Sequence, residues 1–125
     1  MDKEQGLHSF WSGFGLPAYD ERTVPTGFRA PRMPYITYEV VTDNINHPVA
    51  ITGSLWYRGT SWQQITEKQH EIEIAIGYGG KIITLDRGYL WITRGAPFAQ
   101  RMSDDTDDSV RRIIINLMVE YLTAV

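Results

Sequence analysis

The stretch VAITGSLWYRGTSWQQITEKQHEIEIAIG, residues 49–77, contains two periodicities that together decide the fold. Residues 49–58 are rich in β-branched and aromatic side chains, which is typical of a strand. From Ser61 onward the apolar residues follow helical spacing, and Ser61 with Gln64 fits a capping-box pattern. A strand that leads into a helix over 61–77 is therefore predicted. The apolar face of this helix consists of Trp62, Ile65, Ile72 and Ile76.

Two hairpins are predicted on either side of this stretch. Upstream, residues 35–42 also read as a strand, and turn-prone residues separate them from 49–58. These two runs should pair in antiparallel fashion. Downstream, residues 81–85 and 89–93 form a second hairpin around the turn at 86–88.

The last segment, 110–122, is the longest strand candidate, and it follows an irregular stretch at 95–109. Its alternation places most of its large apolar residues on one face. Ile114, Met118 and Leu122 interrupt the polar opposite face, so we expect that face not to be wholly exposed. The apolar face consists of Ile113, Ile115, Leu117, Val119 and Tyr121.

The N-terminus combines a short amphipathic helix with an irregular arm. Four of the six prolines fall within 17–34, which predicts a connecting arm without regular structure. The helix face can pack on the core of its own chain, or it can dock on a neighbouring subunit. If it docks on a neighbour, a chain that lacks residues 1–16 should still fold. The face consists of Leu7, Phe10, Trp11 and Phe14.

These elements predict an α+β fold with a mainly antiparallel sheet of about five strands, packed against one long helix. The N-terminal helix and proline-rich arm occupy 1–33, and the α+β core occupies 34–125, within one domain overall. A chain of 125 residues suits one such domain.

Composition excludes several classes of site. The chain has no cysteine, which removes disulfides, thiolate zinc sites and cysteine nucleophiles. The net charge of −3 argues against a general nucleic-acid binder. No apolar run approaches the ~20 residues that span a bilayer, and the polar start is unlike a signal peptide. We therefore expect a protein that stays inside the cell that makes it.

No catalytic or metal-binding pattern is present. His8, His47 and His70 lie in three separate elements without a second ligand type at metal spacing. The glycine-rich run 77–81 follows a helix, whereas phosphate loops precede one. No local signature of a nucleophilic triad is found, although triads also assemble from distant positions. The prediction is no enzyme, no metal and no cofactor.

The acidic run at 104–108 is the densest charge feature. It does not match an EF-hand, because glycine and glutamate are missing from the required positions. Without its four aspartates the net charge would be +1 instead of −3. It can be a solvated loop, or a negative surface that lets DNA pass without holding it. The four residues are Asp104, Asp105, Asp107 and Asp108.

The aromatic content exceeds what the predicted core needs. Trp56 and Tyr57 cannot share a strand face, whereas Tyr89 and Trp91 do share one. Part of this set should therefore lie outside the core, where aromatic side chains usually contact another protein. The segment 94–102 adds further residue types that are enriched in interfaces.

Several runs together resemble the tail terminator, or tail-completion, family of long-tailed bacteriophages. The shared plan is a strand of the form P-Y-x-x-Y, a second strand ending in an aromatic residue, one long helix and a final strand that begins with basic residues. The resemblance extends from Phe10 to Leu122. The runs that carry it are FWSGFGLPAY (10–19), PYITYE (34–39), SLWYRGTSW (54–62), GGK (79–81), LWI (90–92), RGAPFAQ (94–100) and RRIIIN (111–116).

The resemblance implies an α+β subunit that forms a ring, commonly of six, which caps the tail tube and joins it to the head connector. It implies a virion protein that is assembled in the host cytoplasm, with no catalysis, no cofactor, no membrane contact and DNA only in passage. From residue chemistry we predict an interface between subunits and an acidic rim or lumen at Asp104, Asp105, Asp107 and Asp108. The predicted interface residues are Phe10, Trp11, Phe14, Arg94, Phe98, Arg101 and Met102.

Two alternatives stay open. The chain can be another structural protein of the phage neck, such as a head-completion or connector subunit. It can also be a small enzyme or ligand-binding domain whose site assembles from scattered residues. The structural classes predict oligomers formed through aromatic surfaces, whereas the last class predicts a monomer with one concave pocket.

Overall fold

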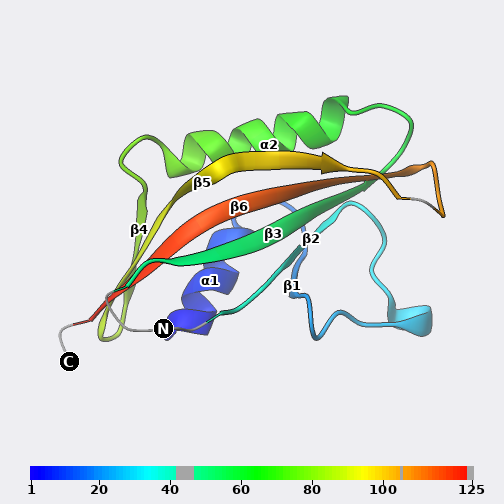
Figure 1. The fold of residues 1–125 in the computed structure, drawn as a ribbon. Helices are drawn as coiled ribbons and strands as arrows, with labels where there is room; N and C mark the ends of the chain where they lie inside the picture. Colours follow the sequence, from blue (N-terminus) through cyan, green and yellow to red (C-terminus); the bar gives the residue numbers. More distant parts are fainter. Residues whose placement is uncertain (42–46, 105, 124–125) are drawn as a thin grey trace.

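The computed structural model describes residues 1–41, 47–104 and 106–123. Over these ranges the chain is an α+β fold in which two helices pack on one curled, mixed six-stranded sheet (Figure 1). The helices are α1 (Lys3–Ser12) and α2 (Gln63–Ile76), with a short 3-10 turn η1 (Gly27–Arg29). The strands are β1 (Ala18–Asp20), β2 (Tyr35–Tyr38), β3 (Val49–Arg58), β4 (Lys81–Leu85), β5 (Gly88–Met102) and β6 (Val110–Thr123).

The strand order is β1-β2-β3-β6-β5-β4, and it confirms both predicted antiparallel pairs. In the first pair, Tyr35 of β2 lies opposite Trp56 of β3. In the second, β4 and β5 join at a tight turn where Leu85 faces Gly88. The long strand β6 pairs with both β3 and β5, so it forms the centre of the sheet.

The sheet departs from the sequence prediction in two places. The arm contains a strand, β1, which pairs in parallel with β2 and makes the sheet mixed and six-stranded. The stretch 95–102 is not irregular, because it continues β5 along β6 past a bulge between Arg94 and Ala99. The side-chain amide of Asn116 donates to the carbonyl of Pro97 at 2.9 Å across this bulge.

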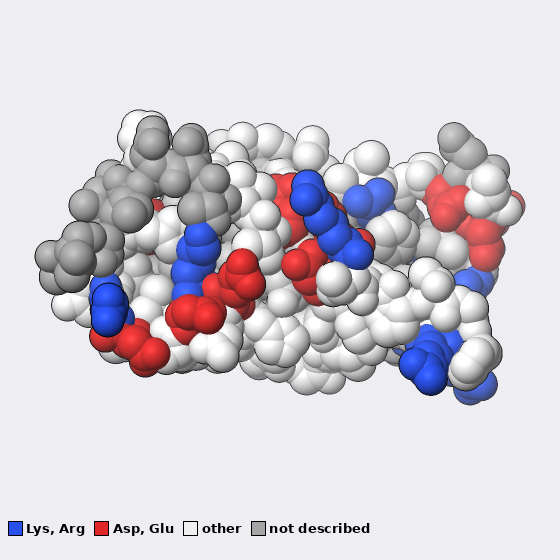
Figure 2. Space-filling view, turned by 90° about the horizontal axis from the view of Figure 1, so that it is seen from below, with Lys and Arg blue, Asp and Glu red and all other residues white. Residues whose placement is uncertain are grey.

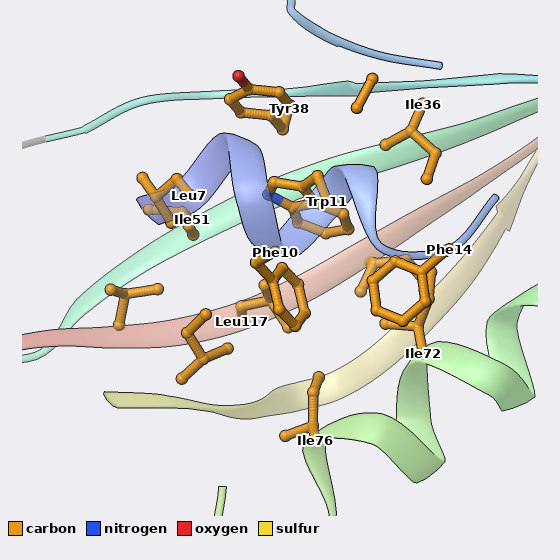
Figure 3. Packing of buried hydrophobic residues seen from close by; sticks show 14 of the residues in the cluster. Leu7, Phe10, Trp11, Phe14, Ile36, Tyr38, Ile51, Ile72, Ile76 and Leu117 are labelled. Atoms are coloured by element: carbon orange, nitrogen blue, oxygen red, sulfur yellow. The ribbon is translucent and has the colours of Figure 1, made fainter. Parts of the chain in front are cut away.

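The register places one face of the sheet inward, and both helices cover that same face. The predicted apolar face of β6 is confirmed, since each of its five residues is buried. Figure 3 shows how side chains from the two helices converge on the strands beneath. The largest fully buried side chains include Leu7, Trp11, Ile36, Ile51, Leu55, Ile65, Ile72, Ile76, Leu90, Ile92, Ile113 and Ile115.

Helix α1 lies close to the sheet because two glycines make room for it. Gly53 of β3 lies under the Trp11 ring, where an added Cβ would come within 2.5 Å of that ring. At Gly6, a Cβ would approach the Leu85 and Leu90 side chains to 2.7 and 2.9 Å. Asp2 begins the helix with a capping box, in which its carboxylate and the Gln5 side chain each accept a backbone N–H.

Helix α2 is slightly shorter than the predicted 61–77. It begins at Gln63, whose N–H donates to the Ser61 hydroxyl at 3.0 Å, and it ends at Ile76, before Gly77 with its φ of 69°. That left-handed conformation favours glycine. The Lys68 ammonium donates to the Phe14 carbonyl at 2.6 Å, which joins α2 to the end of the α1 region. Within the described residues, neither helix combines the length and apolar character needed to cross a bilayer.

Candidate interaction surfaces

The aromatic residues of α1 and the turn after it belong to the core of their own chain. Phe10, Trp11 and Phe14 are 3%, 0% and 7% exposed. Phe10 makes edge-to-face contacts with both Trp11 and Phe14, and Trp11 stacks on Tyr38 of β2. The prediction that these three side chains face a neighbouring subunit is therefore wrong. The alternative interpretation, packing on the parent core, is confirmed.

Most of the predicted interface in 94–102 is also engaged within the chain. Arg94 lies 5.2 Å over the Tyr78 ring and donates to Glu73 and to the Gly77 carbonyl. Arg101 lies 4.9 Å over the Trp62 ring. These contacts place both arginines beside α2, where Arg94 is half-buried and Arg101 stays exposed.

The other two residues of that prediction lie on opposite faces of β5. Phe98 is half-buried and packs against the core, so it does not form an exposed anchor. Met102 lies opposite Arg112 on the outer face of the sheet and is 39% exposed. Of the four residues predicted in this segment, Arg101 and Met102 are exposed.

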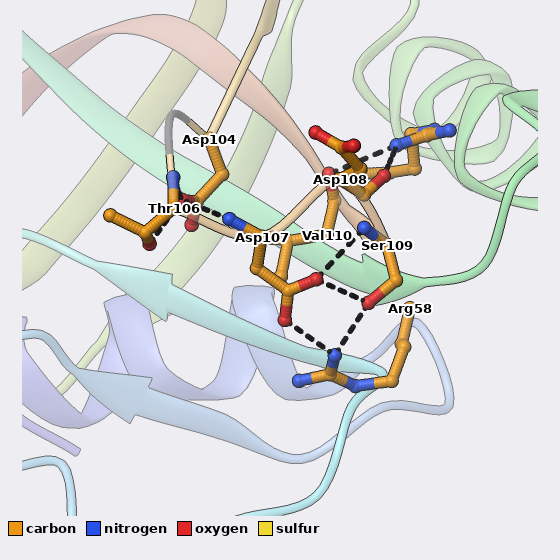
Figure 4. Close-up of polar contacts among 8 residues, drawn as sticks. Arg58, Asp104, Thr106, Asp107, Asp108, Ser109 and Val110 are labelled. Carbon is orange, nitrogen blue, oxygen red and sulfur yellow. Dashed lines mark hydrogen bonds and ion pairs between the residues drawn. The ribbon is translucent and has the colours of Figure 1, made fainter.

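The acidic run forms an organised turn rather than a row of free carboxylates (Figure 4). The Asp104 carboxylate accepts hydrogen bonds from the hydroxyl and N–H of Thr106, and these bonds lower its pKa. The Asp107 carboxylate accepts from the hydroxyl and N–H of Ser109 and from the Arg58 guanidinium at 2.8 Å. The Ser109 hydroxyl first, then Arg58, hold the pKa of Asp107 well below its usual range.

This turn therefore presents less free negative charge than its composition suggests. Asp107 is paired with Arg58, while the Asp108 side chain is exposed and its carbonyl accepts from Arg111. Asp105 lies outside the described residues. A negative rim or lumen would rest mainly on Asp104 and Asp108 among the described positions.

The sheet face opposite the helices exposes large apolar side chains. On β4 and β5, Ile82, Tyr89 and Trp91 are 62%, 49% and 37% exposed. Ile82 lies opposite Trp91, and Tyr89 lies opposite Leu122 of β6. Among the described residues, no helix or strand packs over this face. We call the outer patch the set Ile82, Tyr89, Trp91, Met118 and Leu122.

The other end of the outer face has a ladder of stacked rings. Tyr19 meets Tyr35 edge to face at 6.1 Å, and Tyr35 stacks on Trp56 at 6.3 Å. The Arg112 guanidinium lies 4.5 Å over Trp56 and donates to the Ser54 hydroxyl. The ladder crosses four strands and stiffens this end of the sheet, while its rings stay only half-buried.

The arm between β1 and β2 is a second exposed feature. Phe28 is 96% exposed at the tip, in η1, and the Arg29 guanidinium lies 5.6 Å over its ring. Arg22 and Arg32 are also exposed. Within the described residues none of the three guanidiniums is paired with a carboxylate. We call the basic arm residues 21–34.

Sequence reasoning found one of these two surfaces in part. Alternation placed Tyr89 and Trp91 on a shared face and predicted aromatic residues outside the core, and both are confirmed. The sequence did not predict the basic arm as a surface, because the prolines within 17–34 indicate only an irregular connection. Its three arginines and Phe28, which no apolar periodicity includes, were the available signal.

His8 has ordinary local contacts, and His47 and His70 are exposed. The His8 ring lies 3.0 Å from the Tyr38 hydroxyl and 3.2 Å from the Ser12 hydroxyl. In the part of the chain that the structure describes, no three His, Asp or Glu side chains gather as a metal site would require. The run 77–81 caps α2 and leads into β4, as the sequence indicated.

The sequence of the chain matches no protein-family model, and it matches no curated protein.

Proposed function

We propose that this chain is a structural protein of the bacteriophage virion, a tail terminator that forms a ring on the tail tube and joins it to the head connector. The observation that carries the proposal is the outer patch. An exposed group of large apolar side chains on a folded domain usually marks contact with another protein. The motif resemblance to the tail terminator family supplies the kind of partner.

The proposal draws support from the position of the exposed surfaces. The outer patch lies on one side of the sheet, and the basic arm projects beyond its β1 edge (Figure 1). Two different surfaces on one subunit favour head-to-tail contacts, which close into a ring when the rotation permits. A ring of six fits the resemblance, with the tail-tube protein on one side and a neck or connector protein on the other.

Nothing in this role requires catalysis or a cofactor. DNA would pass through the ring without being held, for which negative charge at Asp104 and Asp108 would suffice. The protein would reside in the tail or neck of the virion after assembly in the host cytoplasm. A head-completion or connector protein of the neck is the alternative role for the same surfaces.

The test measures assembly, first alone and then with tail-tube protein, by mass photometry and negative-stain electron microscopy. Tyr89→Ser should weaken assembly because it removes an apolar ring from the outer patch. Tyr78→Ser is the control, because Tyr78 is more exposed than Tyr89, at 103% against 49%, but lies in the loop after α2. A chain that stays monomeric, does not bind tail tubes and has one pocket that binds a small molecule would favour the enzyme or ligand-binding class instead.

Location in the virion separates the two structural roles. A labelled chain should appear at the head-proximal end of the tail tube, including on tails that have not yet joined a head. Label confined to the head side of the neck in free heads would reject the terminator role and favour a head-completion protein.

A further inference from the structure

The basic arm presents an exposed aromatic ring and three arginines that pair with no carboxylate among the described residues. Phe28 is 96% exposed, although phenylalanine is normally among the most buried residues. Residues 21–34 carry three arginines and one glutamate, a net charge of +2. A projecting basic segment with an apolar tip fits a concave acidic surface on a partner.

The tip is held in shape before any partner binds. The Ala30 N–H donates to the Gly27 carbonyl, and the Arg29 N–H donates to the Thr26 carbonyl. Gly27 has a φ of 66°, a left-handed conformation that glycine adopts without strain. At the base of the arm, the Arg22 N–H donates to the Asp20 carboxylate at 3.0 Å. Such preorganisation reduces the entropy lost on docking.

A concave acidic surface exists on the same chain, between α2 and the end of β3. It is an open hollow of about 400 Å³ lined by Tyr57, Gln64, Glu67, Lys68 and Glu71, which we call the α2 groove. One water occupies about 30 Å³ of liquid, so the hollow has room for a ring and a guanidinium.

The α2 groove has more negative than positive side chains. Lys68 is occupied by Glu71 at 2.6 Å and by the Phe14 carbonyl, whereas Glu67 accepts only from Gln63 at 3.3 Å among the described contacts. The groove therefore has a net charge of −1, with Glu67 free of a cation. Burial, followed by the negative charges of Glu71 and Glu67, raises the pKa of Tyr57.

The arm cannot reach the α2 groove of its own chain. Figure 1 places η1 and α2 on opposite sides of the molecule. In the perpendicular view from below, blue side chains gather at the end of the molecule where the arm projects (Figure 2). Any contact between the two surfaces must therefore join two copies.

We propose that the basic arm of one copy docks in the α2 groove of the next, with Phe28 and Arg29 entering between Tyr57 and Glu67. The contact is head to tail, so repetition produces a ring or a filament. It rests on the proposed function, which requires copies to assemble, and it names the surfaces by which they do so. The acidic turn is the other acidic surface, but two arginines already lie on it, because Arg58 pairs with Asp107 and Arg111 donates to the Asp108 carbonyl.

Charge reversal tests this pairing. Arg29→Glu or Glu67→Arg should each weaken self-association by about tenfold or more, because like charges then meet. The double variant Arg29→Glu/Glu67→Arg should restore it. Lys81→Glu is the control, since Lys81 is exposed on β4, away from both surfaces. Both substituted side chains are exposed, and circular dichroism would verify that each variant folds.

Cross-linking gives a second measurement that leaves the charges at Arg29 and Glu67 unchanged. The chain has no cysteine, so Phe28→Cys and Gln64→Cys can be introduced singly. Under mild oxidation, a mixture of the two single variants should form disulfide dimers, and a chain with both should form a ladder that ends at the ring size. Either variant alone should cross-link far less.

The remaining outcomes distinguish this inference from the proposed function. Rings that form equally well from Arg29→Glu chains, with no cross-linking to Gln64→Cys, would overturn the arm and groove contact and leave the ring intact. A wild-type chain that never assembles, even on tail tubes, would overturn both. Unchanged assembly together with loss of duplex DNA binding in Arg29→Glu would assign the arm to nucleic acid instead.

Discussion

Gly53→Ala tests whether α1 belongs to the core of its own chain. The new Cβ would lie 2.5, 2.7 and 3.0 Å from three atoms of the Trp11 six-membered ring, where ordinary contacts lie at 3.4 Å or more. The ring cannot easily move, because Tyr38 stacks on it at 6.3 Å and Phe10 packs edge-on at 5.1 Å. Overpacking of a filled core costs about 1–3 kcal/mol, and we expect a cost at the upper end of that range.

The assay is urea unfolding followed by far-UV circular dichroism. Gly79→Ala is the matched control, because a Cβ there meets nothing within 4 Å. In the double variant Trp11→Phe/Gly53→Ala the smaller ring should relieve the clash, which predicts a favourable coupling of about 1 kcal/mol or more. If Gly53→Ala unfolds at the same urea concentration as Gly79→Ala, or if the cycle shows no coupling, this packing is refuted.

Three further predictions concern stability. Deleting residues 1–16 removes several fully buried side chains, so the remaining chain should be unfolded or insoluble by circular dichroism; a soluble, folded sheet would contradict the structure. Folding lowers the pKa of Asp107, so the ionised carboxylate stabilises the folded chain above about pH 4, and this stabilisation is lost as the pH falls. The Asp107→Asn variant should therefore lose less stability than the wild type between about pH 6 and pH 3. Asp108→Asn is the control. Burial raises the pKa of Tyr121 to about 12 from its usual 10.0, so stability should fall as the pH rises through this range, and Tyr121→Phe should lose less of it in urea titrations at alkaline pH.

The elements that the sequence predicted well are those whose pattern is local. Both hairpins and most of α2 follow from spacing within about ten to fifteen residues. The face of β6 followed from simple alternation, and the structure buries it as expected. The spacing of apolar residues within such an element is enough to predict it.

The elements that were missed depend on partners far away in the sequence. The apolar face of α1 would look the same whether it covered its own core or a neighbour, and only the fit of the Trp11 ring against Gly53 decides between them. The second half of β5 contains Gly95 and Pro97, which predict a loop, yet pairing with β6 outweighs that preference. Composition likewise could not reveal that Arg58 neutralises Asp107, because the two lie 49 residues apart.

The exposure of the candidate surfaces also depends on contacts between distant parts of the sequence. Alternation alone placed Tyr89 and Trp91 together, but their exposure depends on both helices covering the other face of the sheet. The basic arm becomes visible as a surface only when Arg22, Arg29 and Arg32 are seen to lack carboxylate partners in the described structure.

The most direct test of the central claim, that this chain works by assembling, is the mass of the purified chain mixed with phage tail tubes, measured by mass photometry and imaged by electron microscopy. We expect a closed ring of defined subunit number at one end of each tube. A chain that stays monomeric at tens of micromolar and leaves the tube ends bare would contradict this claim.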